Sequence, residues 1–246
     1  MILLDLESGE TWRVEPGATA VKGVGTMPPH WDELPAGTPF QVGKHKVTAL
    51  PATTADQVAT IRRKAQIILP KDASRILWEL SPRPTDRILE SGIGSGAMTI
   101  PLLAAVPQGK VVAVELRSDF GEWARNNVPS DMVERLEIHL GDLTKGLPPT
   151  VSGPFDAVLL DQPEPWLALP FLAAHLSAGA RVCCYCPQVG QMEAAARTMT
   201  GLGFHGVRAL ELIERAWEIK ERGARPSFDG LGHTGFLIFG RWPGSG

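Results

Sequence analysis

The segment that carries the clearest chemistry runs from Glu90 to Gly96, with the sequence Glu-Ser-Gly-Ile-Gly-Ser-Gly. It follows a short apolar run and precedes a stretch with helical periodicity, so we predict a strand-to-helix turn. Glycines at such a turn let the backbone bend tightly and approach a ligand closely. Glu115 ends the next apolar run, 19 residues after Gly96. A carboxylate there can accept hydrogen bonds from both ribose hydroxyls of an adenosine. The pattern predicts a site for a nucleoside-containing cofactor.

Two classes of cofactor fit this loop. The spacing Gly92-x-Gly94-x-x-Ala97 satisfies the loose dinucleotide fingerprint, which would place a pyrophosphate at the helix N-terminus. A methyl donor with a cationic amino acid end carries no phosphate and favours an acidic residue before the loop, and Glu90 is that residue. A plain strand-to-helix turn is the third interpretation, because the glycines alone are a weak signal.

Two further aspartates follow predicted strands. Asp142, with Leu143 after it, follows the run 136–140, and its carboxylate could accept a hydrogen bond from an adenine amino group or stabilise its own turn. Asp161 opens the segment Asp-Gln-Pro-Glu-Pro-Trp, which ends at Trp166. A loop stiffened by two prolines and holding a carboxylate and an aromatic ring suits a planar base with an amino donor. The alternative is that Asp161 caps the following helix and Trp166 packs against it.

Strands that alternate with helices must position these residues, which predicts an α/β fold with a parallel sheet. We expect a Rossmann-like domain over 61–246 whose C-terminal edge is an antiparallel hairpin, preceded by a small β-rich domain over 1–60. Residues 51–56 read as a linker between the two. The expected strands are 87–90, 110–115, 136–140, 157–160, 181–186, 205–217 and 234–242, and the expected helices are 71–81, 97–105, 118–127, 167–176 and 188–202.

Composition and charge limit the classes of function. The net charge of −3 gives no general attraction to nucleic acid, so RNA binding would need a local basic patch. The best local candidate comprises Arg62, Arg63, Lys64, Lys71 and Arg75, and a solvated linker and helix face is the alternative. No signal peptide or membrane-spanning run is apparent, so we expect a cytoplasmic protein without membrane attachment. The three clustered cysteines read as a buried strand, and we predict no metal site.

These motifs together resemble those of the tRNA (adenine-N1)-methyltransferases, which make 1-methyladenosine in the T-loop of tRNA. The resemblance runs from about Ile61 to Arg241. Its most specific parts are the Asp161–Trp166 loop, Arg225-Pro226 and Gly232-His233-Thr234-Gly235. It implies S-adenosylmethionine as donor, tRNA as substrate and commonly a homotetramer.

The resemblance also implies roles for individual residues. Asp161 would lie near the transferred methyl group as the catalytic residue, Glu115 would bind ribose and Asp142 would bind adenine. The full set of expected cofactor-binding residues is Gln66, Glu90, Gly92, Gly94, Ser95, Gly96, Glu115, Leu116, Asp142 and Leu143. The expected substrate-binding residues are Arg63, Lys64, Trp166, Arg225 and His233, although His233 could instead be a structural residue at a strand start.

The chain departs from the family pattern at two places. It has Lys64-Ala65-Gln66 where the family usually has Arg-Thr-Gln, and Leu69 where the family usually has an aromatic residue. Three alternatives therefore stay open: a methyltransferase acting on a small molecule or protein, a non-catalytic tRNA-binding subunit, and a nicotinamide dehydrogenase. The last lacks any recognisable catalytic dyad in the remaining chain.

Overall fold

The computed structural model describes residues 1–244, and Ser245 and Gly246 of the predicted 61–246 domain lie outside the described residues. The chain divides into two compact units, Met1–Arg62 and Arg63 onward. Each unit has its own hydrophobic core and is described separately below.

The first unit is a small β domain with a four-stranded antiparallel sheet in the order β2-β1-β6-β5. Its strands are β1 (Ile2–Asp5), β2 (Thr11–Arg13), β5 (Pro39–Val42) and β6 (His45–Leu50), with a short ribbon of β3 (Ala20–Val21) and β4 (Gly25–Thr26) and a 3-10 turn at Trp31–Glu33. Leu3, Val42 and Val47 are fully buried in its core.

The predicted linker at 51–56 is wrong in its second half, because helix α1 (Thr54–Ala59) begins there. Thr53 and Asp56 form a capping box. The Thr53 side chain accepts a hydrogen bond from the Asp56 amide, and the Asp56 carboxylate accepts one from the Thr53 amide at 2.9 Å. These bonds satisfy amides that the first turn of a helix leaves open, so a six-residue helix forms within a sequence rich in small polar residues.

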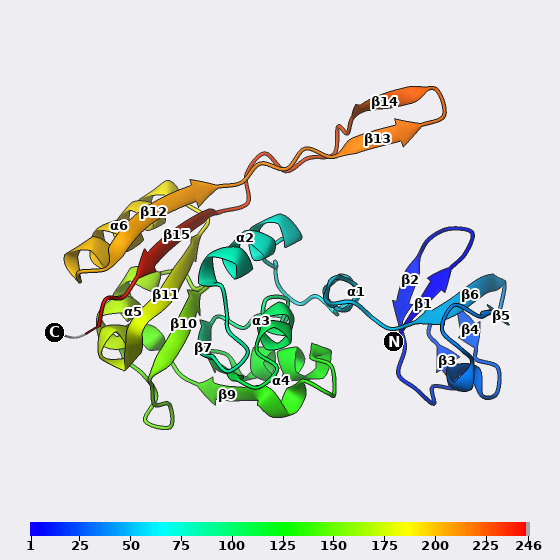
Figure 1. Ribbon diagram of the computed structural model, residues 1–246, viewed down its shortest axis with the longest axis horizontal. Helices are drawn as coiled ribbons and strands as arrows, with labels where there is room; N and C mark the ends of the chain where they lie inside the picture. The colour runs from blue at the N-terminus through cyan, green and yellow to red at the C-terminus, as the bar shows by residue number, and fades with distance from the viewer. Residues whose placement is uncertain (245–246) are drawn as a thin grey trace. The chain divides into compact units, whose positions relative to one another are not determined.

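The second unit contains a seven-stranded sheet in the order β12-β15-β11-β10-β7-β8-β9, which confirms the predicted Rossmann-like fold (Figure 1). Strands β9, β8, β7, β10 and β11 are parallel, and β15 runs antiparallel between β11 and β12. The strands are β7 (Arg87–Ser91), β8 (Lys110–Glu115), β9 (Leu136–Leu140), β10 (Phe155–Leu160), β11 (Leu176–Cys186), β12 (His205–Glu211) and β15 (Phe236–Arg241).

Helices cover both faces of this sheet and bury its apolar side chains. They are α2 (Pro70–Leu80), α3 (Thr99–Ala105), α4 (Ser118–Asn127), α5 (Pro165–Leu172) and α6 (Val189–Gly201), with 3-10 turns at Val133–Arg135, Leu143–Lys145 and Ala173–His175. The predicted helix 167–176 is too long, because the chain tightens into the last of these turns and Leu176 already pairs with Phe155 in the sheet. Cys183, Cys184 and Cys186 are buried in β11, as free thiols.

The C-terminal strands differ from the prediction at the segment that joins them. Strand β12 ends at Glu211, and β15 begins only at Phe236. Between them, β13 (Trp217–Lys220) and β14 (Gly223–Pro226) pair only with each other in a two-stranded sheet. We call residues 212–235 the arm, and Figure 1 shows that it extends away from the seven-stranded sheet. Alternating apolar and charged residues in this stretch look like one long strand, which is why the sequence did not reveal the break.

None of the helices in residues 1–244 is long and apolar enough to cross a membrane.

Candidate cofactor and substrate site

Three acidic side chains gather where strands β7, β8 and β10 end. Glu90 lies one residue before the end of β7, Glu115 is the last residue of β8, and Asp161 follows the last residue of β10. The strands are neighbours, and their register sets Ser91 opposite both Leu160 and Val114. In an open parallel sheet the carboxyl ends of the strands are where ligands bind. The structure therefore brings together the three carboxyl groups that the sequence singled out separately.

The glycine loop is pressed against the strand end that carries Asp161. Gly92 has a φ of 80°, and a Cβ atom built on it would lie 1.8 Å from the Asp161 carbonyl oxygen. The Asp161 amide donates to the Ser91 carbonyl at 2.9 Å, and the Gly92 amide donates to the Val114 carbonyl at 3.2 Å. Only glycine fits this left-handed, crowded position.

Glu90 is 1% exposed and accepts a hydrogen bond from the Thr99 hydroxyl at 2.8 Å. Burial raises its pKa from the usual 4.5 to about 8, because the low-dielectric interior disfavours the charged form. The Thr99 hydrogen bond opposes this rise, whereas the negative charges of Asp161 and Glu115 add to it. A cation beside Glu90 would reverse the effect and ionise it.

Glu115 is held by the chain that follows it. Its Oε1 accepts a hydrogen bond from the Arg117 amide at 3.0 Å, and no other hydrogen bond to this carboxylate occurs within residues 1–244. Leu116, the next residue, is 69% exposed, although it is a large apolar side chain. Glu115 thus keeps an acceptor oxygen beside an exposed apolar surface, which matches the ribose and the ring of a nucleoside.

The Asp161 carboxylate is half-buried, and its side chain makes no hydrogen bond or ion pair within the described part of the chain. Burial, and secondarily the charge of Glu115, raise its pKa from 3.8 to about 7. Its backbone is fixed by the Ser91 carbonyl, and the Ser91 hydroxyl donates to the side chain of Gln162. Gln191 of α6 donates to the Pro163 carbonyl at 2.8 Å. The loop is therefore rigid, while its carboxylate stays available to a ligand.

The segment before α2 is tied to the glycine loop. The backbone amides of Lys64 and Ala65 donate to the Ser95 hydroxyl at 2.9 and 3.4 Å. The Lys64 ammonium group pairs with Asp119 at 2.6 Å and lies over the rings of Phe120 and Trp123. Arg63 and Gln66 are exposed on either side of this anchor. The predicted site residues of this segment thus lie beside the predicted cofactor loop.

Asp142 and Leu143 lie at the end of β9, but their side chains have local roles. Asp142 Oδ1 accepts from the amide and hydroxyl of Thr144 at 3.0 and 2.6 Å, and Oδ2 pairs with Lys145 at 3.0 Å. These donors, the Thr144 hydroxyl first, lower the pKa of Asp142. Leu143 is 2% exposed and packs in the core. These contacts fit the turn-stabilising interpretation of Asp142, and its role toward an adenine stays a prediction.

The remaining predicted substrate residues are spread over three elements. Trp166 is half-buried in the first turn of α5, directly after the Asp161 loop. Arg225 is on β14 in the arm, where it pairs with Glu218 at 2.9 Å. His233 closes the base of the arm: Nδ1 contacts Glu211 at 2.6 Å and Nε2 contacts the Pro187 carbonyl at 2.8 Å. Both ring nitrogens face acceptors, which raises the pKa of His233 and supports its structural interpretation.

Sequence reasoning missed a buried network beside this site. The Lys71 ammonium group donates to Asp72, the Leu212 carbonyl and the Thr234 hydroxyl at 2.8, 2.8 and 2.6 Å. Asp72 is fully buried and accepts from the Thr234 hydroxyl at 2.7 Å, while Tyr185 donates to the Thr234 carbonyl at 2.8 Å. The network fastens both ends of the arm to the first turn of α2. The sequence analysis placed Lys71 in a candidate RNA-binding patch. The structure corrects this prediction, because the Lys71 ammonium group is engaged in the buried network.

A comparison with protein families identifies the family of this chain. The family model described as "tRNA methyltransferase complex GCD14 subunit" matches residues 50–227, which is more than half of the chain. The matched stretch includes the glycine loop, Glu115 and the Asp161 loop.

Similar proteins agree with this match. A tRNA (adenine(58)-N(1))-methyltransferase from Thermus thermophilus is 33% identical over 223 residues, covering 88% of this chain and 87% of that protein. A tRNA (adenine(57)-N(1)/adenine(58)-N(1))-methyltransferase from Methanocaldococcus jannaschii is 28% identical, covering 81% and 79%. Among solved structures, a SAM-dependent O-methyltransferase from Thermotoga maritima superposes with a TM-score of 0.81 at 28% identity, covering 98% and 91%. The chain therefore belongs to the tRNA methyltransferase family represented by the GCD14 subunit.

Proposed function

We propose that this protein transfers a methyl group from S-adenosylmethionine to N1 of an adenosine in the T-loop of tRNA. The observation that carries the proposal is the Asp161 carboxylate. It has no partner within residues 1–244, its pKa is raised to about 7, and its backbone packs against Gly92 of the cofactor loop. A carboxylate held in this way beside a donor site can orient a base whose amino group donates a hydrogen bond.

The residues at the strand ends fit S-adenosylmethionine. The absence of a Cβ atom at Gly92 lets the glycine loop pack directly against the Asp161 backbone, which sets the loop beside the three acidic strand ends. The buried Glu90 carboxyl suits the cationic amino acid end of the donor, and Glu115 with the exposed Leu116 suits its ribose and adenine. The Asp142 carboxylate is engaged by Thr144 and Lys145, so we assign adenine binding to Leu116 and the backbone at 142–143.

For this methyl transfer, the main task of the protein is to position the adenine next to the methyl donor. When bound, the donor supplies an electrophilic methyl group on a positively charged sulfur. The N1 atom of adenine is unprotonated near neutral pH, so no strong base is needed. Asp161 accepts a hydrogen bond from the exocyclic amine, orients the ring and stabilises the positive charge that develops on it. The target base has to leave its stack, and Trp166 offers a flat surface for it at the start of α5.

The test is methyl transfer from labelled S-adenosylmethionine to unmodified tRNA, followed by nucleoside analysis. We expect 1-methyladenosine as the product. Donor binding without transfer to tRNA would overturn the proposed substrate, and failure to bind the donor would overturn the proposed activity as a whole.

We expect donor binding to release a proton from Glu90. Near pH 7 the buried carboxyl is mostly protonated, because its pKa is raised to about 8, and a cationic ligand favours the ionised form. Calorimetry in two buffers of different ionisation enthalpy measures this release, which we expect to approach about one proton per donor. Glu90→Gln should abolish the release, whereas Glu122→Gln on the exposed side of α4 should leave it unchanged.

The same pKa shift makes the stability of the ligand-free protein depend on pH. The folded state keeps a proton on Glu90 that the unfolded chain releases, so the free energy of unfolding decreases as pH rises from about 4.5 to about 8. Thermal unfolding across this window should show the decrease. Glu90→Gln should make the decrease smaller and leave the part that Asp161 contributes, because the pKa of Asp161 is also raised, from 3.8 to about 7. A donor-induced proton release that persists in Glu90→Gln would contradict the assignment of Glu90.

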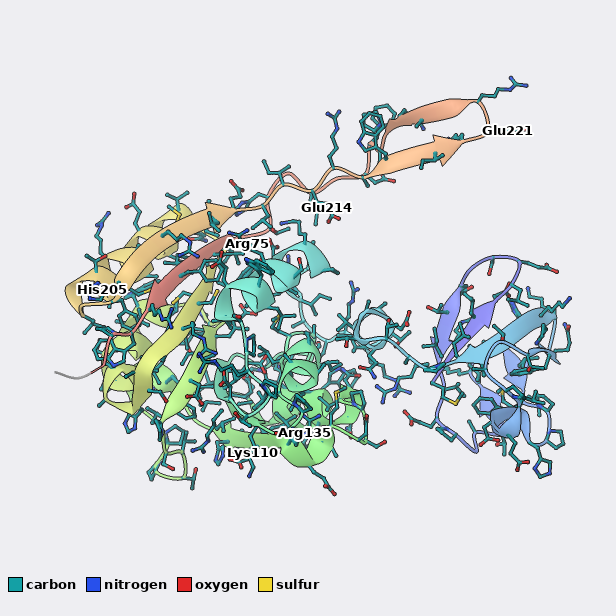
Figure 2. All side chains as sticks on the ribbon, viewed as in Figure 1. Arg75, Lys110, Arg135, His205, Glu214 and Glu221 are labelled. Carbon is teal, nitrogen blue, oxygen red and sulfur yellow. The ribbon has the colours of Figure 1, made fainter. Side chains whose placement is uncertain are left out.

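We infer that the protein assembles as a homo-oligomer, a tetramer by resemblance to the family, and that the arm is part of the interface. An isolated two-stranded hairpin is marginally stable in water. Yet β13 and β14 pair only with each other, and five large apolar side chains of the arm are 60% to 87% exposed: Ile213, Trp217, Ile219, Phe228 and Leu231. Figure 2 shows Glu214 and Glu221 along the same extension. A second copy of the chain would cover this apolar surface.

Ile219→Glu should therefore dissociate the assembly. Light scattering coupled to size exclusion should give a multiple of the 26.5 kDa chain for the wild type and a smaller mass for the variant. Leu6→Glu is the matched control, because Leu6 is a 45% exposed leucine in the first unit. A monomeric wild type, or an unchanged mass for Ile219→Glu, would contradict the role of the arm.

A further inference from the structure

The structure neutralises most of the basic stretch that the sequence offered for RNA binding. Lys64 pairs with Asp119, Lys71 pairs with the buried Asp72, and Arg75 pairs with Glu79. The chain has a net charge of −3. A ligand with many phosphates therefore needs a different positive surface, assembled by the fold rather than by consecutive residues.

Such a surface forms a pocket of about 300 Å³ between the end of α2 and strands β11, β15 and β12. Its wall carries Arg181, His205, Arg208 and Arg241 around Phe239 and Glu79. Three of these basic residues form a row across the sheet, because Arg241 of β15 stands opposite Arg181 on one side and His205 on the other. Figure 2 shows His205 at the start of β12 and Arg75 on α2.

The cations of this pocket outnumber their carboxylate partners. Arg208 pairs with Glu79, which also pairs with Arg75, and Arg181 pairs with Asp86. Arg241 makes no ion pair within the described residues, and its Nε donates only to the Gly179 carbonyl at 3.3 Å. The three arginines of the pocket and the neighbouring Arg75 thus share two carboxylates, Glu79 and Asp86, which leaves an excess of two positive charges.

This arrangement of basic residues favours the binding of an anion. Like charges directly opposite each other on neighbouring strands are destabilising, so the row gains when an anion lies among them. Guanidinium groups bind phosphate through paired N–H donors. Arg208 is half-exposed and lies over the Phe239 ring at 5.7 Å, which leaves its remaining donors on the open side of the pocket.

The position of the pocket indicates a large ligand. Arg181 pairs with Ala157, and Asp161 follows four residues after Ala157, which corresponds to about 13 Å along the strand direction. The pocket is therefore remote from Asp161 at the carboxyl ends of the strands. We propose that the pocket formed by Arg181, His205, Arg208 and Arg241 binds backbone phosphates of the tRNA. This proposal rests on the proposed function, in which a base of the same tRNA is methylated at the other end of the sheet.

Arg241→Gln tests this without touching the donor site. We expect the dissociation constant for fluorescently labelled, unmodified tRNA to rise about 3- to 10-fold. The slope of log affinity against log salt should fall by about one, because one phosphate contact is removed. The dissociation constant for S-adenosylmethionine and kcat at saturating tRNA should not change. Arg197→Gln on α6 is the matched control, since Arg197 is an exposed arginine whose one ion pair within residues 1–244 is with Glu193, four residues before it.

Three outcomes would overturn the proposal. One is tRNA affinity in Arg241→Gln that equals that of Arg197→Gln. A second is a change in native mass, which would make the pocket a contact between copies of the chain. A third is tripolyphosphate binding that depends on Arg241 while tRNA affinity does not, which would make it a small-anion site. The tRNA binding measurement does not depend on turnover. If the wild-type protein made no 1-methyladenosine but Arg241→Gln still weakened tRNA binding, the proposed reaction would be rejected and the proposed phosphate site would stand.

Discussion

Asp161→Ala is expected to lower kcat for tRNA methylation by about 100- to 1,000-fold, the usual cost of removing one group that stabilises developing charge. The carboxylate has no partner within residues 1–244, so in this proposal it is free to hold the base amine and offset the positive charge on the ring. Its removal deletes no hydrogen bond within the described protein. The dissociation constant for S-adenosylmethionine should therefore change little, which calorimetry can measure beside single-turnover kinetics.

The pH dependence distinguishes the charge of Asp161 from its shape. Burial and Glu115 raise its pKa to about 7, so the side chain is mostly protonated below that pH and ionised above it. The carboxylate accepts the amine hydrogen bond more strongly than the neutral acid does, and only the carboxylate carries the compensating charge. We therefore expect kcat/KM to rise as pH increases through about 7. Asp161→Asn keeps the size of the side chain but cannot ionise. The residual kcat/KM of this variant should therefore not rise as pH increases through about 7.

Two results would contradict the role of Asp161 in orienting the base. Asp161→Asn with wild-type kcat and an unchanged pH profile would remove Asp161 from the reaction. A loss of donor binding that parallels the loss of kcat would assign Asp161 to the donor site rather than to the base.

Gly92→Ala should nearly abolish donor binding and turnover. The added Cβ would lie 1.8 Å from the Asp161 carbonyl oxygen, and the φ of 80° is a backbone conformation that alanine rarely adopts. The left-handed conformation alone costs about 1–2 kcal/mol, and the contact with the backbone cannot be relieved by a side-chain rotation. The loop must move away from the end of β10, which separates the donor site from Asp161. We expect the donor dissociation constant to rise more than about 10-fold and the melting temperature to fall by about 3 °C or more.

Gly190→Ala in α6 is the control for Gly92→Ala. A Cβ at Gly190, the second residue of α6, would meet nothing within 4 Å, and alanine is a better helix former than glycine. This variant should bind the donor normally and be at least as stable as the wild type. If Gly92→Ala also bound the donor with wild-type affinity, the packing of the loop against Asp161 would have no role in the donor site.

Local patterns in the sequence predicted most of the fold and the grouping of Glu90, Glu115 and Asp161 at neighbouring strand ends. The strand-helix alternation from Arg87 to Gly201 is visible because hydrophobic periodicity depends on near neighbours in the chain. The glycine loop, Glu115 and Asp161 were predictable for the same reason, since each follows a recognisable strand and parallel strands end at one edge of a sheet. Resemblance to the family then reduced the candidate cofactors to S-adenosylmethionine and the candidate substrates to tRNA.

Contacts between distant residues decided the rest. Lys71 looked like a surface cation, but the fold buries it against Leu212 and Thr234, more than 140 residues away in the chain. Asp142 could have faced a ligand, and the structure turns it to Thr144 and Lys145. The break between β12 and β13 is hidden because exposed and buried strands can share the same alternation of residue types.

The sequence by itself determined the α/β architecture, the glycine loop and the acidic residues at the strand ends, because each of these features depends on residues that lie close together in the chain. Only the tertiary structure decided which charges are neutralised and which remain available. The pairing register brought Arg181, His205 and Arg241 into one row, and the packing of Lys71 and Asp72 removed two charges from the surface. Whether a charge has a partner depends on long-range pairing, and no local pattern of residue types encodes that pairing.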